Sequence, residues 1–511
     1  MTMAGMKLVR ERNAIVKNPR GKLRVALVYP QRYRAGVANL GMQIVYAMLN
    51  QREEVYAERF YLDVHDGVRS IETRSPLRDF EVIAVCWQFE PDALNLLSML
   101  ERGGVPLDRG ERRQVVLAGG PCAVNPLPLA DFVDAFYIGE AEAGVEEVVE
   151  ALHAGERSQV LEELASLDYF YVPGVKEHAT RVLAEKLAPL PVHQVVSEAG
   201  AFGESYLLEV ARGCTRSCRF CLGGYIFRPR RERDVGEVEA LVREWADSEV
   251  RKVALLGASV TDYTHLERLT GVLSDVRMQV SAPSLRADAL TPEFLEMLVR
   301  SGQRTVTIAP ESCEELRLRL NKRLTDDVLM EAVRLCSEAG VRNLKLYMMY
   351  GLPGERREHV EAAAALVREV AKAFRGRVRV SLSPFIPKPH TPLQRCGFAG
   401  VGELRRRFRL FRKLLGGIEV EGESPRASWV QAVIARGGRE LGEVLLGVHR
   451  RGSGEWRRAP APERELSGEL PWECIDVRIA RSFFEEEYRR YLAGEASPEC
   501  FPGCRRCGAC T

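Results

Sequence analysis

The sequence predicts an α/β protein of three parts: a doubly wound parallel sheet, a curled parallel sheet or partial barrel, and a small helical, cysteine-rich extension. Two observations predict the sheets, since short apolar runs alternate with helix-like stretches before residue 140 and again over 205–387. The third observation is that three cysteines cluster at 214–221 and four in the last twelve residues. We therefore expect domains at 1–195, 196–395 and 396–511.

Composition narrows the class of protein. The chain has 511 residues, of which 46% are hydrophobic and 28% charged, so it is long enough for several domains. A net charge of +2 gives no bulk sign of affinity for nucleic acid or membranes. The charged N-terminus lacks the apolar core of a signal peptide, and no apolar run reaches the roughly 18 residues of a membrane span. We expect a cytoplasmic protein without a membrane partner.

The first part carries five strand-like runs with helix-like stretches between several of them. The runs are 23–30, 56–64, 82–89, 114–120 and 135–140. This alternation predicts a parallel sheet with helices on both faces. Ligands of such sheets bind at the carboxyl ends of the strands, where glycines let the backbone approach closely. In this sequence those ends carry Gly119, Gly120, Gly139 and Glu140.

The second part repeats strand and helix six times, and the third is helical and basic. The six runs are 205–210, 252–257, 279–285, 305–310, 344–355 and 377–387. A partial (β/α)6 barrel with its site at the carboxyl ends of the strands accounts for this order. The arginines of 402–417 could contact RNA phosphates, although a solvated amphipathic helix explains them as well.

Cys214, Cys218 and Cys221 form a C-x-x-x-C-x-x-C loop directly after a predicted strand. Three thiolates on one short loop can ligate three irons of a 4Fe-4S cluster, and the fourth iron then stays open. A structural zinc site is the alternative, but zinc takes four ligands and no fourth cysteine lies nearby. The spacing therefore favours an iron-sulfur cluster that can bind a further ligand.

With this loop the chain closely resembles the radical S-adenosylmethionine (SAM) superfamily. The resemblance implies that the open iron binds SAM, that reduction cleaves SAM to a 5'-deoxyadenosyl radical, and that a reductase such as flavodoxin or ferredoxin supplies the electron. It also implies SAM-binding roles for Phe220, Arg286, Glu311, Gly351 and Pro353. Three alternative interpretations stay open. Arg286 can be a surface arginine, Glu311 a helix-capping glutamate, and Gly351 and Pro353 parts of a strand-ending turn.

The N-terminal half resembles the flavodoxin-like cobalamin-binding domain that precedes many radical SAM barrels. The resemblance implies that its loops cradle a corrin, although glycines after strands also serve tight turns in any doubly wound domain. The residues expected to bind cobalamin are Asn39, Gly41, Gly119, Gly120, Gly139 and Glu140.

The C-terminal tail offers four further thiolates within one turn-rich segment. They belong to Cys500, Cys504, Cys507 and Cys510. Four ligands make a closed site, either an auxiliary 4Fe-4S cluster or a tetrahedral zinc, and a tail with free thiols is a third option.

These features predict a radical SAM enzyme whose substrate, RNA or protein among the options, is open. If cobalamin binds, methylation of an unactivated carbon is the expected reaction. If cobalamin does not bind, the expected reaction is a rearrangement or sulfur insertion. A non-catalytic iron-sulfur protein for electron transfer or redox sensing is the alternative from another class. The sequence identifies no general base, and Tyr347, Tyr350 and His390 are candidate lining residues. The resemblance extends to a radical SAM family of unassigned function, but departs from it where Cys474 replaces an expected histidine.

Overall fold

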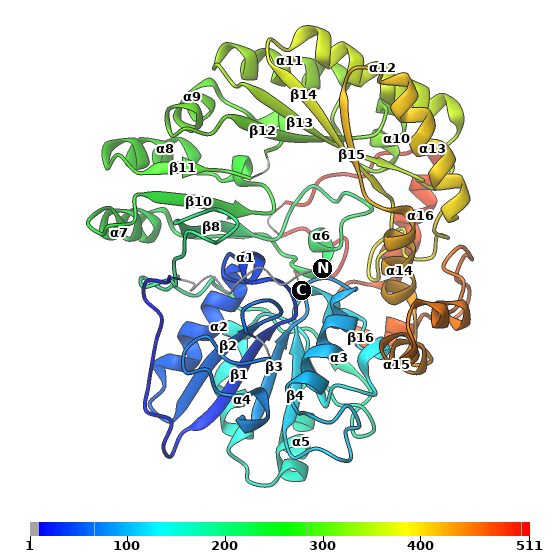
Figure 1. The fold of residues 1–511 in the computed structure, drawn as a ribbon. Coiled ribbons are helices and arrows are strands. Elements are labelled where there is room, and N and C mark those ends of the chain that lie inside the picture. Colours follow the sequence, from blue (N-terminus) through cyan, green and yellow to red (C-terminus); the bar gives the residue numbers. More distant parts are fainter. Residues whose placement is uncertain (1–9, 66, 284, 502, 511) are drawn as a thin grey trace. The chain divides into compact units, whose positions relative to one another are not determined.

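The computed structural model describes residues 10–65, 67–283, 285–501 and 503–510 (Figure 1). It divides into two compact units, each built from separate stretches of the chain. Unit 1 comprises Met1–Leu207, Ile434–Pro460 and Glu469–Arg478, and unit 2 comprises Leu208–Val433, Ala461–Gly468 and Ile479–Thr511.

Unit 1 is built on a sheet of six strands in the order β2-β1-β3-β4-β5-β6. The first five strands are parallel and β6 is antiparallel to β5. This order is the doubly wound arrangement that the sequence predicts. The strands are β1 (Leu23–Tyr29), β2 (Val55–Tyr61), β3 (Val82–Cys86), β4 (Val115–Gly119), β5 (Ala135–Tyr137) and β6 (Phe170–Tyr171).

Helices cover both faces of this sheet because alternate strand residues are apolar on each side. Val25 and Leu27 of β1 join the core cluster that also holds Leu49, Leu152 and Leu164, on three different helices. The residues between them, such as Ala26, are buried on the other face. The helices are α1 (Tyr33–Gly36), α2 (Leu40–Gln51), α3 (Asp92–Arg102), α4 (Val145–Leu152), α5 (Arg157–Ser166) and α15 (Leu441–Arg451).

Part of the C-terminal extension belongs to unit 1, which differs from the division into three successive domains expected from the sequence. The buried Asn125 side chain donates hydrogen bonds to the carbonyls of Ala435 and Gly437, at 3.1 and 3.0 Å. Strand β16 (Ile475–Asp476) pairs in parallel with β7 (Ala179–Thr180). These long-range contacts have no local sequence signal, so the split could not be predicted from composition.

Unit 2 contains the six predicted strands, in two sheets ordered β11-β10-β8-β9 and β12-β13-β14-β15. The backbone N–H of Leu285 donates to the Thr307 carbonyl at 3.0 Å, so the chain links the two sheets between β11 and β12. The strands are β8 (Tyr206–Arg212), β9 (Arg231–Glu232), β10 (Lys252–Gly257), β11 (Gln279–Ser281), β12 (Thr305–Glu311), β13 (Asn343–Tyr350), β14 (Arg377–Pro384) and β15 (Glu419–Gly422).

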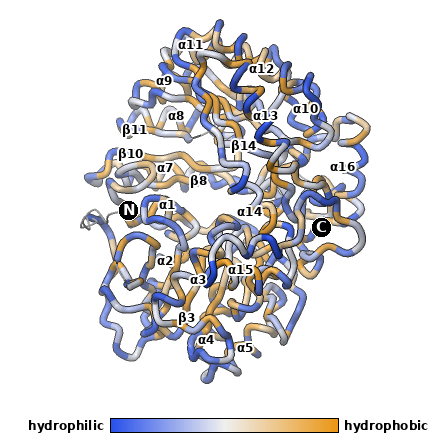
Figure 2. Tube along the Cα trace, turned by 45° about the vertical axis from the view of Figure 1, so that its right-hand side comes forward, coloured by the Kyte–Doolittle hydropathy of each residue, from blue (hydrophilic) through white to orange (hydrophobic). Residues whose placement is uncertain are grey.

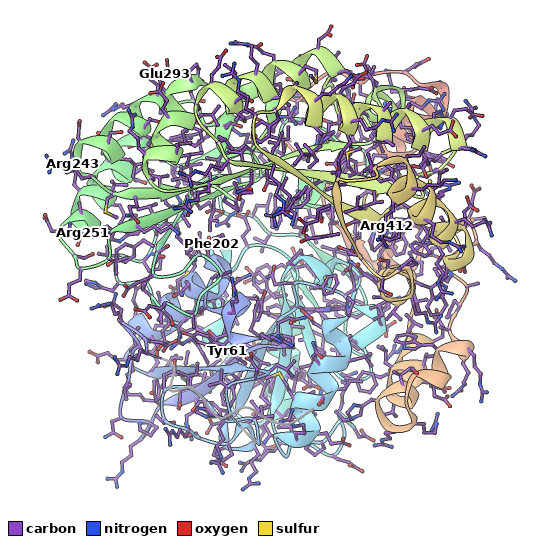
Figure 3. All side chains as sticks on the ribbon, turned by 45° about the horizontal axis from the view of Figure 1, so that its top comes forward. Tyr61, Phe202, Arg243, Arg251, Glu293 and Arg412 are labelled. Atoms are coloured by element: carbon purple, nitrogen blue, oxygen red, sulfur yellow. The ribbon has the colours of Figure 1, made fainter. Side chains whose placement is uncertain are left out.

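The helices of unit 2 lie on the outer face of these sheets, and hydrophobic stretches follow the strands (Figures 1 and 2). Charged side chains such as Arg243 and Glu293 point outward from the helices (Figure 3). The helices are α6 (Gly223–Ile226), α7 (Val235–Ala246), α8 (Leu266–Asp275), α9 (Pro292–Arg300), α10 (Glu314–Arg319), α11 (Asp326–Glu338), α12 (Arg357–Ala373), α13 (Val401–Leu414), α14 (Pro425–Arg436) and α16 (Arg481–Ala493). Across the described ranges, no helix combines the length and the apolar character that crossing a membrane requires.

The side chains of β13 alternate between the face of the sheet that the helices cover and the inner face. Leu344, Leu346, Met348 and Tyr350 are buried, and the Tyr350 ring lies 6.2 Å from that of Phe408 on α13. The alternating residues therefore point to the inner face of the sheet. Tyr347 is 40% exposed there although β13 is a central strand.

Candidate functional site

The cysteine loop begins where β8 ends. Gly213 has a φ of 81°, and a Cβ there would lie 2.8 Å from the Pro229 carbonyl oxygen, so only glycine fits. Ser217 follows with a φ of 57°, and the Tyr225 hydroxyl donates to its carbonyl at 3.3 Å. The backbone N–H of Cys221 donates to the Cys218 carbonyl at 3.1 Å. These turns fold the loop back over the end of the strand.

The three thiols of the loop interact electrostatically with one another and with two cations. Burial raises the pKa of Cys218 to about 12, Lys322 and Arg286 lower it, and the neighbouring Cys221 and Cys214 raise it. Burial also raises the pKa of Cys221, which Lys322 again lowers. Thiols must lose their protons to bind metal, so ligation here releases protons while nearby cations favour the thiolates.

Glu311 lies at the carboxyl end of β12 and is paired with a lysine that sequence reasoning missed. Its Oε1 atom accepts a hydrogen bond from Lys322 Nζ at 2.6 Å, and both residues are buried. Its φ of 69° follows an irregularity in the pairing of β12 with β13. A non-glycine residue with positive φ is strained by about 1–3 kcal/mol, and such strain often occurs at functional sites. The predicted SAM ligand Glu311 thus lies beside the cysteine loop.

Arg286 also lies beside the loop, in a network of five charged side chains that includes Glu499, 3.0 Å from Arg216. It donates to both carboxylate oxygens of Asp288, at 2.9 and 2.7 Å. Arg216, inside the cysteine loop, donates to both oxygens of Asp262, at 3.0 and 2.5 Å. Arg216 also lies 3.7 Å from Asp288. Of these residues the sequence predicted Arg286, and the position of Asp262 just after β10 was a further signal that sequence reasoning missed.

The Gly351 turn ends β13 and is held by its own chain. Gly351 has a φ of 78°, and its backbone N–H donates to Glu355 Oε2 at 2.8 Å. Arg407 of α13 pairs with the same carboxylate at 2.5 Å, and the Tyr491 hydroxyl donates to the Pro353 carbonyl at 2.6 Å. Burial raises the pKa of Glu355, while the Gly351 N–H and Arg407 lower it. The turn is therefore a rigid end of the strand.

The other candidate lining residues have different environments. Phe220 is partly exposed beside Cys221. Tyr347 lies on the inner face, whereas Tyr350 faces α13, so the interpretation of Tyr350 as a lining residue is wrong. Two strand residues three apart point to opposite faces, which accounts for the difference. His390 is buried in the loop after β14, and its backbone N–H donates to Gln394 Oε1 at 3.0 Å.

The tail cysteines lie near one another and against the cysteine loop. The Cys510 thiol interacts electrostatically with Cys507, Cys504 and Cys500. The backbone N–H of Cys500 donates to the Thr215 carbonyl at 3.0 Å. In the part of the chain that the structure describes, no three His, Cys, Asp or Glu side chains converge tightly enough to hold a single metal ion.

At the carboxyl edge of the unit 1 sheet, chain contacts account for four of the six residues expected to bind cobalamin. Asn39 Oδ1 caps α2 by accepting from the Met42 N–H at 2.9 Å. Gly120 has a φ of 105°, and a Cβ there would lie 2.8 Å from the Trp87 carbonyl. Gly139 makes a close approach to Val182, and the buried Glu140 accepts from the Ala184 N–H at 3.1 Å.

Gly41 and Gly119 are different, because a Cβ at either position would meet no atom closer than 3.4 Å. The edge has further polar groups that sequence reasoning missed. Gln31, after β1, donates to Asp92 Oδ1 at 2.8 Å, and Asn95 donates to the Pro30 carbonyl at 2.9 Å. They lie where the strand order reverses between β1 and β3, the usual ligand position of such a sheet.

Two family models match the chain. The model "Radical SAM proteins, N-terminal" covers residues 41–173, and the model "Radical SAM superfamily" covers residues 208–367. The second range includes the cysteine loop, Arg286, Glu311 and the Gly351 turn.

Curated relatives and a solved structure agree with these matches. The uncharacterized protein MJ0966 of Methanocaldococcus jannaschii is 32% identical over 434 residues, which cover 82% of this chain and 90% of the relative. A tRNA-2-methylthio-N(6)-dimethylallyladenosine synthase of Pelobacter propionicus is 27% identical over 32% of this chain and 41% of its own length. The radical SAM methyltransferase TsrM of Kitasatospora setae, solved with cobalamin and a 4Fe-4S cluster bound, matches with a TM-score of 0.54 and 16% identity. That match covers 73% of this chain and 77% of TsrM, and it shows the fold alone.

Proposed function

Because the chain belongs to the radical SAM superfamily of enzymes, we propose that Cys214, Cys218 and Cys221 hold the 4Fe-4S cluster at which SAM is cleaved. The observation that carries this proposal is that their thiols lie together at the end of β8, beside Lys322 and Arg286. When bound, the cluster supplies the electron that breaks the sulfonium bond of SAM.

The charged residues around the loop suit a ligand with a carboxylate, an amine and hydroxyl groups. Arg286 and Lys322 are cations that favour a carboxylate, and Glu311 offers oxygens that accept hydrogen bonds from ribose hydroxyls. When hydroxyls donate to Glu311, Lys322 still neutralises its charge, so a buried carboxylate remains tolerable. Phe220 and the rigid Gly351–Pro353 turn are proposed to position the adenine.

We further propose that unit 1 binds cobalamin and that the reaction is methylation of an unactivated carbon. The doubly wound sheet, its open positions Gly41 and Gly119, and the fold similarity to cobalamin-bound TsrM support this step. The structural roles of Asn39, Gly120, Gly139 and Glu140 make Gly41 and Gly119 the better probes of the site.

The cobalamin proposal is tested by reconstituting the protein with hydroxocobalamin, removing free cofactor and recording the absorbance of bound corrin. A Gly119→Leu variant should bind much less corrin, because a bulky side chain would occupy the carboxyl end of β4, where a Cβ meets no atom closer than 3.8 Å. Gly271→Leu in α8 of unit 2 is the matched control, since a Cβ there also meets nothing within 4 Å. A clean protein spectrum for the wild type would remove the methylase proposal.

The inner face of the second sheet is the proposed substrate surface. Lys345 lies 5.3 Å from the Tyr347 ring centroid and 3.4 Å from Glu421, and Arg379 is the neighbour of Lys345 across the β13–β14 pair. An exposed ring with two flanking cations favours a substrate with a planar group and negative charge. RNA offers both, and a protein substrate remains the other candidate.

Sulfur insertion without cobalamin is a second candidate, favoured by the partial similarity to the methylthiolating tRNA enzyme. Incubating the reduced protein with SAM separates the candidates. A methylase and a methylthiolating enzyme both form 5'-deoxyadenosine and S-adenosylhomocysteine, and bound corrin distinguishes the methylase. A rearrangement enzyme forms 5'-deoxyadenosine alone, and an electron-transfer protein forms neither. We propose a flavodoxin or ferredoxin as reductase and the reducing cytoplasm as location.

A further inference from the structure

The tail repeats the spacing of the cysteine loop and adds one ligand. Cys500, Cys504 and Cys507 follow the same C-x-x-x-C-x-x-C pattern as Cys214, Cys218 and Cys221, and Cys510 comes three residues later. A 4Fe-4S cluster has four irons. The loop offers thiolates for three of them, whereas the tail offers one thiolate for each iron.

The tail is built into unit 2 through backbone hydrogen bonds to two of its own ligand residues. The Cys500 N–H donates to the Thr215 carbonyl at 3.0 Å, and the Cys507 carbonyl accepts from the Ala480 N–H at 2.9 Å. Since Thr215 follows Cys214, one hydrogen bond and one peptide separate the first ligand of the tail from the first ligand of the loop.

A buried charged network fixes the segment just before the tail to the loop. Arg219, which is fully buried, donates to Glu487 at 3.1 Å, to Ser497 Oγ at 2.7 Å and to the Glu495 carbonyl at 2.8 Å. Asn321 accepts from the Ser497 N–H at 2.9 Å and donates to the Ser217 carbonyl at 3.3 Å. Breaking a buried charged network is costly, so these contacts hold residues 495–497, just before the tail, against the loop.

Arginines supply the positive charge that a four-thiolate cluster needs. The Arg228 side chain lies over the Tyr225 and Phe483 rings, at 4.7 and 5.8 Å, and interacts electrostatically with Cys507 and Cys500. It also donates to Ser217 Oγ at 2.7 Å, so it contacts both cysteine segments. A buried cation stabilises the negative charge of nearby thiolates, and Arg228 is such a cation beside the tail cysteines.

The spacing of the tail favours a cluster over zinc. The C-x-x-x-C-x-x-C pattern of Cys500, Cys504 and Cys507 repeats that of the loop cysteines, and Cys510 adds a fourth thiolate. Four thiolates can each bind one iron of a 4Fe-4S cube or together bind one zinc ion, so the bound metal decides between the two.

We propose that Cys500, Cys504, Cys507 and Cys510 hold a second, closed 4Fe-4S cluster that passes electrons to the cysteine loop. A closed cluster has no iron free for SAM, so its chemistry is the transfer of one electron. It takes the electron from a low-potential one-electron donor protein of the flavodoxin or ferredoxin class and releases the same electron toward the loop. No bond forms or breaks in the tail, and no proton is required.

The site is tested by metal analysis of anaerobically reconstituted full-length protein. The wild type should contain about eight irons and no stoichiometric zinc, and Cys504→Ser/Cys507→Ser about four irons. Cys214→Ala/Cys218→Ala/Cys221→Ala should also keep about four irons, with an EPR spectrum that SAM does not change. Cys474→Ser, at a partly exposed cysteine of unit 1, is the matched control and should match the wild type. One zinc per chain that disappears with the tail cysteines, or iron that the tail variant retains, would overturn the proposal.

Electron transfer has its own readout, the rate at which reduced clusters appear by EPR. The tail variant should lose rapid reduction by reduced flavodoxin but keep reduction by dithionite, a small molecule that can reach the loop directly. If reduced flavodoxin reduces the tail variant as fast as it reduces the wild type, the electron-transfer role is refuted. Cys510→Ala, at an exposed position where loss of folding is not expected, should also lose tail iron. Unchanged iron and spectrum in that variant would contradict the assigned ligand set.

Discussion

The carboxyl ends of the strands in the two units carry similar sequence signals but use them differently. In unit 2 the residues expected from the sequence, Arg286 and Glu311, lie beside the cysteine loop, each paired there with a residue of opposite charge, Asp288 and Lys322. In unit 1 the expected residues Asn39, Gly120 and Glu140 are engaged by the chain itself. The cysteine spacing of unit 2 therefore predicts a functional site better than the glycines of unit 1, because glycines occur in any tight turn.

The strongest test of this contrast removes a loop ligand. Cys218→Ala should abolish iron binding at the loop and bring 5'-deoxyadenosine formation below detection, because a cluster held by two thiolates is labile. Iron content and product assays on the reconstituted protein measure both effects. Cys336→Ala, at a buried cysteine of α11, should change stability and leave both readouts intact.

The next largest effect concerns the buried Glu311–Lys322 pair. Lys322→Met leaves a buried carboxylate without its cation and should lower the free energy of unfolding by about 3–5 kcal/mol. The double variant Glu311→Gln/Lys322→Met should recover most of that loss, as measured by denaturant unfolding. Both variants should weaken SAM binding, and an effect on stability alone would restrict the pair to a structural role.

The corresponding pair in unit 1 provides the comparison. The buried Arg59 pairs with Glu72 at 2.6 Å and with Glu11 at 2.7 Å. Arg59→Met leaves both carboxylates without their cation and should destabilise the protein by at least about 3–5 kcal/mol. SAM binding by the folded fraction should be unchanged. Weakened SAM binding in this variant would break the contrast between a functional and a structural ion pair.

A smaller effect separates the glycines of unit 1. Gly120→Ala should lower stability by about 1–3 kcal/mol, because of its positive φ and the nearby Trp87 carbonyl. Gly41→Ala in α2 should leave stability unchanged or raise it by up to about 1 kcal/mol. Thermal unfolding measures both, and equal losses would mean that Gly41 also serves the fold.

The smallest expected effect is a pH dependence at the edge of the unit 1 sheet. Burial raises the pKa of Asp92 to about 6, from 3.8, while Gln31 lowers it. Since the folded pKa lies above the unfolded one, the associated stability is present below about pH 4 and is lost as pH rises through 6. Asp92→Asn should therefore stabilise the protein at pH 7 by roughly 1–2 kcal/mol, with little effect at pH 4. Unfolding curves at both pH values measure this, and a pH-independent difference would contradict it.

The sequence predicted both sheets and the cysteine loop because strand alternation and ligand spacing are local signals. It missed Lys322, since its approach to Glu311 depends on how the chain passes from α10 to α11. It also missed the division of the C-terminal extension, which follows from the Asn125 contacts and the β16–β7 pair. Tyr350 is an avoidable error, because strand periodicity alone places it opposite Tyr347.

The central claim is that three loop thiolates hold a cluster with one iron open to SAM. The most direct test is to quantify 5'-deoxyadenosine formed by the reduced, reconstituted protein with SAM, in wild type and in Cys221→Ala. The account predicts product in the wild type and none in the variant. Product that is absent from both, or equal in both, would contradict it.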